Sequence, residues 1–184
     1  DLHQLIQDEF SGLDVLVCAN LPYYITSPVI MKLLEEKLPV ESLTVMVQKE
    51  AAVRICAAPG TRACGAVSVA VQYYSQPQIL FDVPRDCFFP APNVDSAVIR
   101  LNIRKEPPVK LETEEKQFFK LVKAAFGQRR KTVLNSLNTG LGKSKEELSA
   151  ALQQAGIEPT ARAEQLTMEQ FGTLCNLLFP NKAK

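Results

Sequence analysis

Histidine and tryptophan are nearly missing from the chain, which has one histidine, His3, and no tryptophan. Zinc sites draw on closely spaced His and Cys ligands, and a Ser-His-Asp or Cys-His arrangement needs a histidine base. The five cysteines are scattered without a C-x-x-C pair, which is typical of reduced thiols in a cytosolic protein. We therefore expect no metal site and no histidine-dependent hydrolase. Cys18 lies in an apolar run and is expected in the core, whereas His3 is expected at the surface.

Long hydrophobic runs are also missing. No window holds the roughly 18 apolar residues that a membrane-spanning helix needs, and the first ten residues lack the basic start and apolar core of a signal peptide. Hydrophobic residues make up 46% of the 184 residues and charged residues 22%, values typical of a folded globular protein. The sequence thus predicts a cytoplasmic protein of one domain or two small ones, with no membrane partner.

The net charge is close to zero, but the two signs are unevenly distributed. Residues 1–104 hold 8 basic and 11 acidic side chains, and residues 105–184 hold 13 basic and 9 acidic ones. The C-terminal part is therefore the better candidate for contact with a polyanion.

The first part of the chain alternates between strand and helix patterns. Residues 14–20, D-V-L-V-C-A-N, form a short apolar run typical of a strand buried on both faces of a parallel sheet. Ser27-Pro28 then offers an N-cap and a first helical position for a helix over 29–38. Residues 42–49 predict a second buried strand and 50–58 a second helix. This alternation favours an α/β fold with a layered sheet and right-handed crossovers.

The same alternation continues further along the chain. Residues 65–74 fit helix or strand by periodicity, and their small side chains favour helix. Residues 78–84 and 95–103 predict strands, and the loop at 87–92 between them contains two prolines that exclude a helix. A pair such as Phe88-Phe89 is by itself more typical of a core than of a binding surface.

Only helix patterns follow Pro107-Pro108, which makes this pair the natural boundary between two domains. We therefore expect domains at 1–106 and 107–184. The helices expected in the second domain cover 113–126, 130–138, 144–154 and 163–178.

Polar and aromatic residues directly follow the first predicted strand, in the motif N-L-P-Y. Ligands of open α/β sheets gather at the carboxyl ends of the strands. The Asn20 side chain offers one carbonyl acceptor, and the Leu21 carbonyl, placed before Pro22, offers another, so that together they can hold one amino group. Tyr23 gives a flat face for a planar base, and Phe88 can cover the other side. In the simpler alternative, Asn20 caps a turn and the rings only pack, which a lone N-x-P-Y favours.

Four motifs occur in one order: N-L-P-Y-Y-I-T-S-P, V-Q-K-E, F-F-P-A-P-N-V-D-S-A-V and F-G-Q-R-R-K-T-V-L-N-S-L. In this combination the sequence resembles the bacterial small-subunit (16S) ribosomal RNA adenine N6,N6-dimethyltransferases, over essentially its whole length. The resemblance implies transfer of methyl groups from S-adenosylmethionine to two adjacent adenines near the 3′ end of small-subunit rRNA. The implied partner is this rRNA in the assembling small ribosomal subunit.

The resemblance also assigns roles to individual residues. Residues 20–23 match the catalytic N-L-P-Y motif of the family, Phe88 matches the second aromatic residue that encloses the target base, and Asn20 lies where the family contacts the cofactor. The cluster of Arg129, Arg130 and Lys131 is expected to contact RNA phosphates, although a basic run alone equally suits a solvated helix turn.

One part of the family pattern is missing. The glycine-rich cofactor loop and the acidic ribose-binding residue of the family precede N-L-P-Y, and the segment from Gly60 to Gly65 cannot replace them because it follows a predicted helix. The expected fold is therefore α/β: the C-terminal half of a Rossmann-like S-adenosylmethionine-dependent methyltransferase sheet, followed by a small all-helical domain. Residues 1–106 would be a partial catalytic domain and residues 107–184 an rRNA-recognition domain of an N-terminally truncated member, inactive by itself.

Two other functions remain open from the sequence. One is a related large-subunit rRNA adenine methyltransferase that confers antibiotic resistance. The other is a ribosome-assembly factor that binds RNA without catalysis. The leucine of N-L-P-Y and the F-G-Q-R-R-K-T segment favour the small-subunit enzyme by resemblance.

Overall fold

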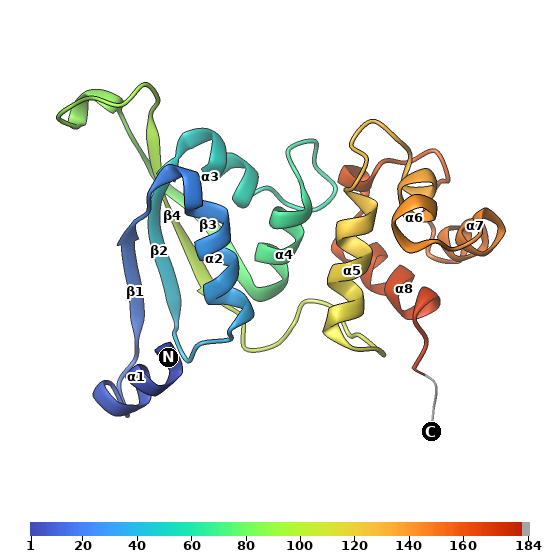
Figure 1. Cartoon of the computed structure of the whole chain (residues 1–184), viewed down its shortest axis with the longest axis horizontal. Coiled ribbons are helices and arrows are strands. Elements are labelled where there is room, and N and C mark those ends of the chain that lie inside the picture. Colours follow the sequence, from blue (N-terminus) through green and yellow to red (C-terminus); the bar gives the residue numbers. More distant parts are fainter. Residues whose placement is uncertain (182–184) are drawn as a thin grey trace. The chain divides into compact units, whose positions relative to one another are not determined.

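The computed structural model describes residues 1–181, which form two compact units. The first, here called the sheet unit, combines Asp1–Cys56 with Ala70–Glu106. The second, the helical unit, combines Ala57–Val69 with Pro107–Lys184. Figure 1 shows the elements of both units in chain order. No helix in the described part of the chain has the length and apolar character needed to cross a membrane.

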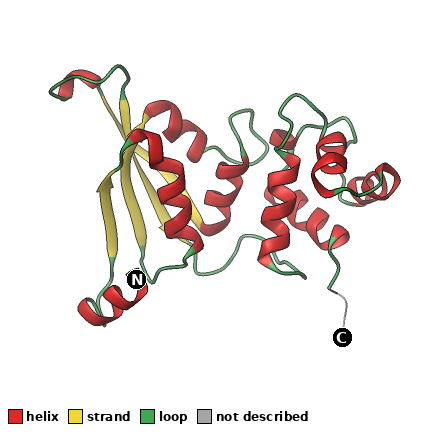
Figure 2. Ribbon diagram, viewed as in Figure 1, coloured by secondary structure: helices red, strands yellow, loops and turns green. Residues whose placement is uncertain are grey.

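The sheet unit is built on four strands in the order β1-β2-β4-β3. β1 runs parallel to β2, and β4 runs antiparallel to both β2 and β3. Consequently β1, β2 and β3 all point the same way, and their carboxyl ends meet the start of β4 at one end of the sheet. This arrangement of strands and helices confirms the expected α/β class (Figure 2). The strands are β1 (Leu16–Asn20), β2 (Ser42–Gln48), β3 (Ser75–Val83) and β4 (Ser96–Ile103).

The expectation that residues 14–20 are buried on both faces was wrong. β1 alternates between exposed and half-buried residues, and Leu16 is 66% exposed. Cys18, expected in the core, is also exposed. The reason is topological: among residues 1–181, β1 pairs with β2 alone and is an edge strand. The apolar residues of β1 would allow a neighbouring element to cover the strand. Within residues 1–181, however, one face of β1 is open to solvent.

The core of the sheet unit lies on one face of the sheet. The central strands β2 and β4 bury alternate residues there, among them Leu43, Val45, Ile99 and Leu101. Alternation of this kind is the period of a strand with one covered face. Helix α3 packs against β2, β3 and β4. The helices of this unit are α1 (Leu2–Glu9), α2 (Thr26–Glu35) and α3 (Lys49–Ile55), together with the part of α4 (Ala66–Tyr74) that begins at Ala70.

Helix α2 starts earlier than the sequence predicted. Its first helical residue is Thr26, preceded by a 3-10 turn at Tyr23–Ile25, so Ser27 is not the N-cap. Pro28 therefore sits inside the first turn rather than at its first position. It is tolerated there because the first N–H groups of a helix have no intrahelical acceptor. Strand β3 likewise includes Pro77, which is compatible with its place at the other edge of the sheet.

The helical unit packs its helices around a separate apolar core, in which Phe118, Leu137 and Phe171 are fully buried. Full burial of such a side chain stabilises the fold by roughly 1.5–3 kcal/mol. The helices are α5 (Glu115–Ala125), α6 (Val133–Leu141), α7 (Lys145–Gln154) and α8 (Met168–Leu178).

Two helices of this unit begin later than predicted, and in both cases a threonine N-cap decides the boundary. Thr132 accepts a hydrogen bond from the Asn135 N–H, so α6 begins at Val133 rather than at 130. Thr167 and Gln170 form a reciprocal capping box, so α8 begins at Met168 rather than at 163. The residues before Thr132 form turns, and Ala163–Gln165 form a separate 3-10 helix before Thr167.

Helices α5 and α6 approach each other closely at Gly140. A Cβ added at Gly140 would lie 2.7 Å from the Ala124 Cβ and 3.0 Å from its Cα. We predict that Gly140→Ala lowers the free energy of unfolding by about 1–3 kcal/mol, because the strain of overpacking exceeds the gain in helix propensity. Urea unfolding followed by circular dichroism measures the change.

The matched control is Gly65→Ala, because the added Cβ meets only the Ser68 Oγ at 4.0 Å. It is expected to leave the unfolding midpoint nearly unchanged. Equal midpoints for the Gly140→Ala variant and the unsubstituted protein would contradict the close contact of α5 and α6.

Candidate functional site

The turn that follows β1 is held by backbone contacts on both sides. The Leu21 N–H donates to the Met46 carbonyl of β2 over 3.4 Å. The Pro22 carbonyl accepts from the Ile25 N–H and from the Thr26 hydroxyl, both at 3.2 Å. Asn20, at the carboxyl end of β1, is exposed. The sequence predicted that residues 20–23 lie at the carboxyl end of a strand, as they do. The hydrogen bonds of the turn hold Asn20 and the Leu21 backbone in place.

Tyr23 is anchored to a residue that the sequence analysis missed. Its hydroxyl lies 2.6 Å from the Ser96 Oγ, the two groups sharing one hydrogen bond. Ser96 is the first residue of β4 and is fully buried. A serine at the start of an apolar strand needs a hydrogen-bond partner when buried, and this is the signal that could have pointed to it. The half-buried Tyr23 ring is thereby fixed, and its exposed part remains accessible.

Phe88 and Phe89 lie in the loop that joins β3 to β4. The loop starts with a short 3-10 turn, Arg85–Cys87, and projects beyond the end of the sheet (Figure 1). Phe88 is half-buried, whereas Phe89 has a relative exposure of 103%. Phe89 therefore does not follow the core-like tendency of such pairs, and its ring is open to solvent. Proline on both sides of a short loop leaves little room to fold the second ring inward.

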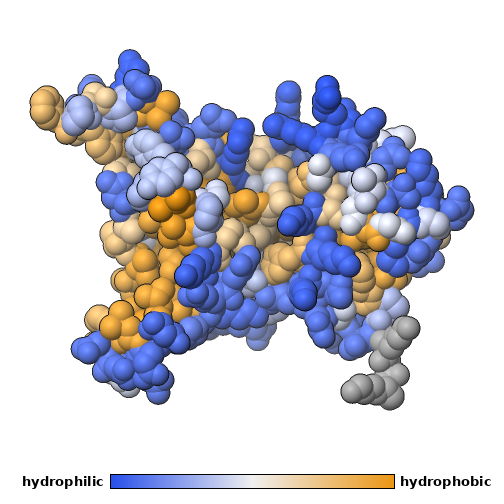
Figure 3. All heavy atoms as spheres, in the orientation of Figure 1, coloured by the Kyte–Doolittle hydropathy of each residue, from blue (hydrophilic) through white to orange (hydrophobic). Residues whose placement is uncertain are grey.

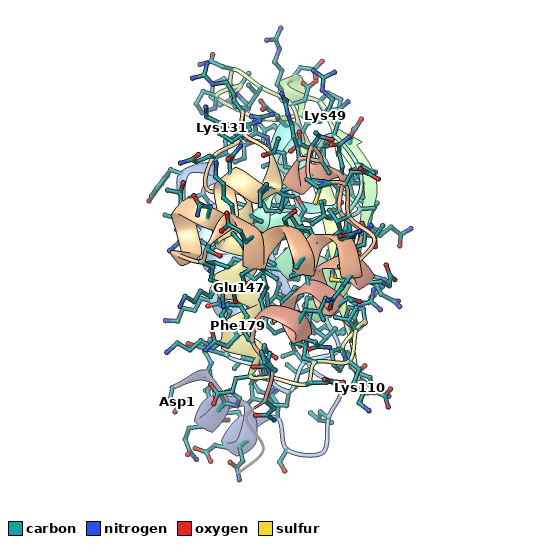
Figure 4. The ribbon with its side chains drawn as sticks, turned by 90° about the vertical axis from the view of Figure 1, so that its right-hand side faces the viewer. Asp1, Lys49, Lys110, Lys131, Glu147 and Phe179 are labelled. Carbon is teal, nitrogen blue, oxygen red and sulfur yellow. The ribbon has the colours of Figure 1, made fainter. Side chains whose placement is uncertain are left out.

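The base of this loop is fastened at Asp95. One carboxylate oxygen of Asp95 accepts from the Arg85 N–H at 3.0 Å, and its backbone carbonyl accepts from the Lys49 N–H at 3.0 Å. The Lys49 ammonium also donates to the Asp82 carboxylate at 2.6 Å. This hydrogen bond, together with the attraction between the two charges, raises the pKa of Lys49. In Figure 4 Lys49 lies at the same end of the molecule as the projecting loop of Figure 1.

An open depression of about 570 Å³ lies beside the loop base. Its size is within the range of small-ligand sites. It mixes polar, cationic and anionic groups, and none of the sequence-predicted site residues lines it. The lining residues are Gln48, Lys49, Glu50, Val53, Arg85, Asn93, Val94 and Asp95.

The structure brings some of the predicted residues to one place and not others. Residues 20–23 and Phe88 all belong to segments at the same end of the sheet. Within residues 1–181, the Tyr23 and Phe88 rings make no ring contact with each other. The basic cluster belongs to the helical unit and is a separate feature.

The basic cluster of Arg129, Arg130 and Lys131 forms the turn between α5 and α6. All three side chains are exposed, and none of the ion pairs within the described residues includes them. Exposed cations without acidic partners are free to neutralise an external anion.

The described residues contain no cluster of metal ligands: no group of three or more His, Cys, Asp and Glu residues among them can hold a metal ion. Burial raises the pKa of the Cys56, Cys64 and Cys175 thiols to about 11. These thiols are therefore protonated at neutral pH and are poor nucleophiles.

Comparison with known proteins identifies the relatives of this chain. The family model described as "Ribosomal RNA adenine dimethylase" matches residues 5–179. The chain belongs to this family. A member from Geobacillus sp. (strain WCH70), named ribosomal RNA small subunit methyltransferase A, is 52% identical over 182 residues, which are 97% of this chain and 62% of that protein. A member of the same name from Alkaliphilus oremlandii is 55% identical over 179 residues, again 97% and 62%.

Solved structures share the fold. A dimethyladenosine transferase from Plasmodium falciparum matches with a TM-score of 0.71 and 25% identity, over 92% of this chain and 68% of that one. The 23S rRNA methyltransferase ErmE matches with a TM-score of 0.63 and 24% identity, over 96% and 78%. These neighbours confirm a Rossmann-like methyltransferase fold. The chain spans 62% of the length of the curated relatives named above.

The hydrogen bond between Tyr23 and Ser96 is predicted to contribute to the stability of the folded chain. Tyr23→Phe leaves the buried Ser96 hydroxyl without its partner, and we expect it to lower the free energy of unfolding by about 1–3 kcal/mol. Ser96→Ala is expected to cost a similar amount or less. Thermal or urea unfolding of both single variants and the double variant measures the coupling.

The double variant should be more stable than the sum of the two single effects predicts, because both groups then lose the same bond. Strictly additive effects would show that the two hydroxyls do not interact.

Proposed function

We propose that this chain is the part of a small-subunit rRNA adenine N6,N6-dimethyltransferase that holds the target adenine and grips the RNA. The observation that most directly supports this proposal is the turn at residues 20–23. It lies at the carboxyl end of β1 and is held by backbone hydrogen bonds and by the hydrogen bond between Tyr23 and the buried Ser96. The family membership and the names of the curated relatives support this assignment. Such a protein acts on the rRNA of the assembling small subunit, in the cytoplasm.

In the proposed reaction the protein orients the N6 amino group of the adenine toward the methyl group. The target base leaves its stack and enters between the Tyr23 face and Phe88, where stacking replaces the lost base contacts. The Asn20 side-chain oxygen and the Leu21 carbonyl accept from the N6 amino group. With its hydrogens held in this way, the nitrogen lone pair is directed toward the incoming methyl group. Positioning of this kind accounts for most of the catalysis.

S-adenosylmethionine supplies the methyl group on a positively charged sulfur. Of the residues described, only Asn20 is proposed to contact it, and no glycine-rich loop follows a first strand in this sequence. The residues present therefore fit the acceptor side of the reaction, and by themselves do not form a complete cofactor site. We infer that the 184-residue chain alone binds S-adenosylmethionine weakly.

No strong general base is needed in this proposal. The amino proton can leave to water after the nitrogen has acquired the methyl group, so the scarcity of histidine is no obstacle. The Tyr23 hydroxyl is engaged by Ser96 at 2.6 Å, which leaves the face of the ring as the part of Tyr23 that serves the base. The faces of Tyr23 and Phe88 also favour the positive charge carried with the methyl group.

The two domains are proposed to divide the work. Residues 1–106 hold the adenine, and residues 107–184 recognise rRNA through Arg129, Arg130 and Lys131. The division of the structure after Glu106 supports this assignment, and the helical unit also includes Ala57–Val69. Phosphate contacts from the three cations supply affinity, whereas the base contacts supply selection of the adenine.

Two alternatives are less well supported. ErmE, a 23S rRNA methyltransferase, is 24% identical and shares the fold, whereas the relatives at 52% and 55% identity carry the small-subunit name. A factor that binds RNA without catalysis would not need the Asn20 and Leu21 acceptors at the end of β1. Loss of function on removal of Asn20 separates this alternative from the enzyme.

Methyl transfer tests the proposal directly. This chain is joined to the part of the Geobacillus relative that lies outside the match and is assayed with labelled S-adenosylmethionine on undermethylated small subunits. We expect methylation of adjacent adenines, and a loss of about 100-fold or more in rate on Asn20→Ala or Tyr23→Ala, because the amine is no longer positioned. The 184-residue chain alone is expected to be inactive.

The matched control is Tyr24→Ala, since Tyr24 adjoins the motif but is 85% exposed. It should retain most of the activity. Full methylation by the Asn20→Ala chimera would overturn the proposed mechanism.

The basic cluster makes a second prediction about RNA affinity. Replacing Arg129, Arg130 and Lys131 together by glutamine should weaken binding of this chain to a small-subunit rRNA hairpin. It should also reduce the slope of log K against log salt by about two to three, roughly one for each lost phosphate contact. Fluorescence anisotropy over a salt series measures both.

The control replaces Lys32 and Arg54 by glutamine, since these cations already face Glu36 and Glu50. Its slope should match that of the unsubstituted chain. An unchanged slope in the triple variant would mean that the cluster is only a solvated turn.

A further inference from the structure

Phe89 is the most exposed of the large hydrophobic side chains of the described residues. Its relative exposure is 103%, above that of Tyr24 at 85% and Leu13 at 66%. The segment C-F-F-P-A-P around it has no charged residue. Figure 3 shows hydrophobic residues at the tip of the projecting loop. The loop thus offers an aromatic ring to solvent, and burying that ring against a partner would be favourable.

The two rings of the pair lie in different environments. Phe88 is half-buried, whereas Phe89 is fully exposed. The chain bends at both residues. Phe89 lies one residue from the ring that encloses the adenine in the proposed function, and it is therefore placed to meet the RNA beside that base.

The loop is also fixed enough to present a ring without a large entropic cost. Asp95 accepts from the backbone N–H of Arg85 at 3.0 Å, and the Lys49 N–H closes the other side of the loop base. Pro90 and Pro92 restrict the backbone on the far side of Phe89. A ring held in this manner loses little freedom on binding, which favours affinity.

We propose that Phe89 stacks on an unpaired nucleobase of the RNA that flanks the pair of adenines, on the outer side of the adenine that enters the site. This inference rests on the proposed function. Drawing one adenine out of its stack leaves the neighbouring base without one of its contacts, and the Phe89 ring replaces it. Stacking of this kind accepts any base, so Phe89 contributes affinity and local RNA geometry rather than sequence choice. A single ring is too small for a stable protein interface, which needs about 800 Å² from each partner.

The lack of tryptophan makes the proposal directly measurable. In Phe89→Trp the new side chain is the only tryptophan of the chain. The probe is an rRNA hairpin with two adjacent adenines in its loop. We expect the tryptophan emission to be quenched on binding, because a stacked base quenches indole fluorescence. Quenching should be lost when the nucleotides that flank the adenine pair are abasic, and kept when the adenines themselves are abasic.

The control is Leu13→Trp, another exposed position, located before the opposite end of β1. Its emission should not change with the same RNA. Phe89→Ala should weaken RNA binding by about five- to one-hundred-fold, the loss typical of one base-stacking ring. Because stacking involves no charge, its salt slope should remain that of the unsubstituted chain, unlike the slope of the basic-cluster variant. Circular dichroism confirms that each variant is folded.

The outcomes separate the two proposals. If the unsubstituted chain binds the hairpin but Phe89→Ala binds equally well and Phe89→Trp is not quenched, the role of Phe89 is wrong and the proposed function stands. If quenching follows the adenines instead of their neighbours, Phe89 belongs to the adenine site and the inference is again wrong. If the unsubstituted chain does not bind the RNA, the RNA-gripping role of this chain fails, and the role of Phe89 fails with it.

Discussion

The insertion of β4 between β2 and β3 is the constraint on which the site depends. Because β4 runs against its neighbours, its first residue, Ser96, lies where the other strands end. Tyr23, which leaves the end of β1, can then share a hydrogen bond with Ser96 across 73 positions of sequence. The loop that enters β4 carries Phe88 to the same end. One antiparallel strand thus brings the turn after β1 and the aromatic loop to the same edge of the sheet.

The two halves of the proposed adenine site are held in different ways. The turn at residues 20–23 is fixed by backbone hydrogen bonds to β2 and within itself, and by the buried Thr26. The loop that carries Phe88 and Phe89 is held at its base, by Asp95 and by the hydrogen bond that Arg85 donates to the Asn93 carbonyl, and its tip stands in solvent. The acceptor oxygens of Asn20 and Leu21 are held rigidly, whereas the aromatic rings project on a loop. This arrangement suits a large substrate, because RNA can contact the loop before its base is oriented at the acceptors. Binding energy gained away from the reacting atoms can then be used to position them.

The helical unit contributes a different kind of interaction. Its core of fully buried aromatic and aliphatic side chains makes it a compact body, and its unpaired cations lie in a turn rather than on a helix. Thr132 sets the place of that turn by capping α6. Had the helix begun at residue 130, as its sequence pattern predicted, two of the three cations would lie on the helix itself. The N-cap therefore decides how the charge is presented.

The sequence by itself determined the class of the fold and the family, because apolar periodicity and linked motifs are local properties. It also placed residues 20–23 at the end of a strand, and the structure confirms that position. Only the tertiary structure decided that one face of β1 is open to solvent, that Ser96 anchors Tyr23, and that Phe88 is half-buried while Phe89 is fully exposed. These features depend on strand order and on contacts between distant segments. A run such as L-V-C-A-N is equally apolar whether a neighbour covers it or not, so its burial cannot be read from its composition.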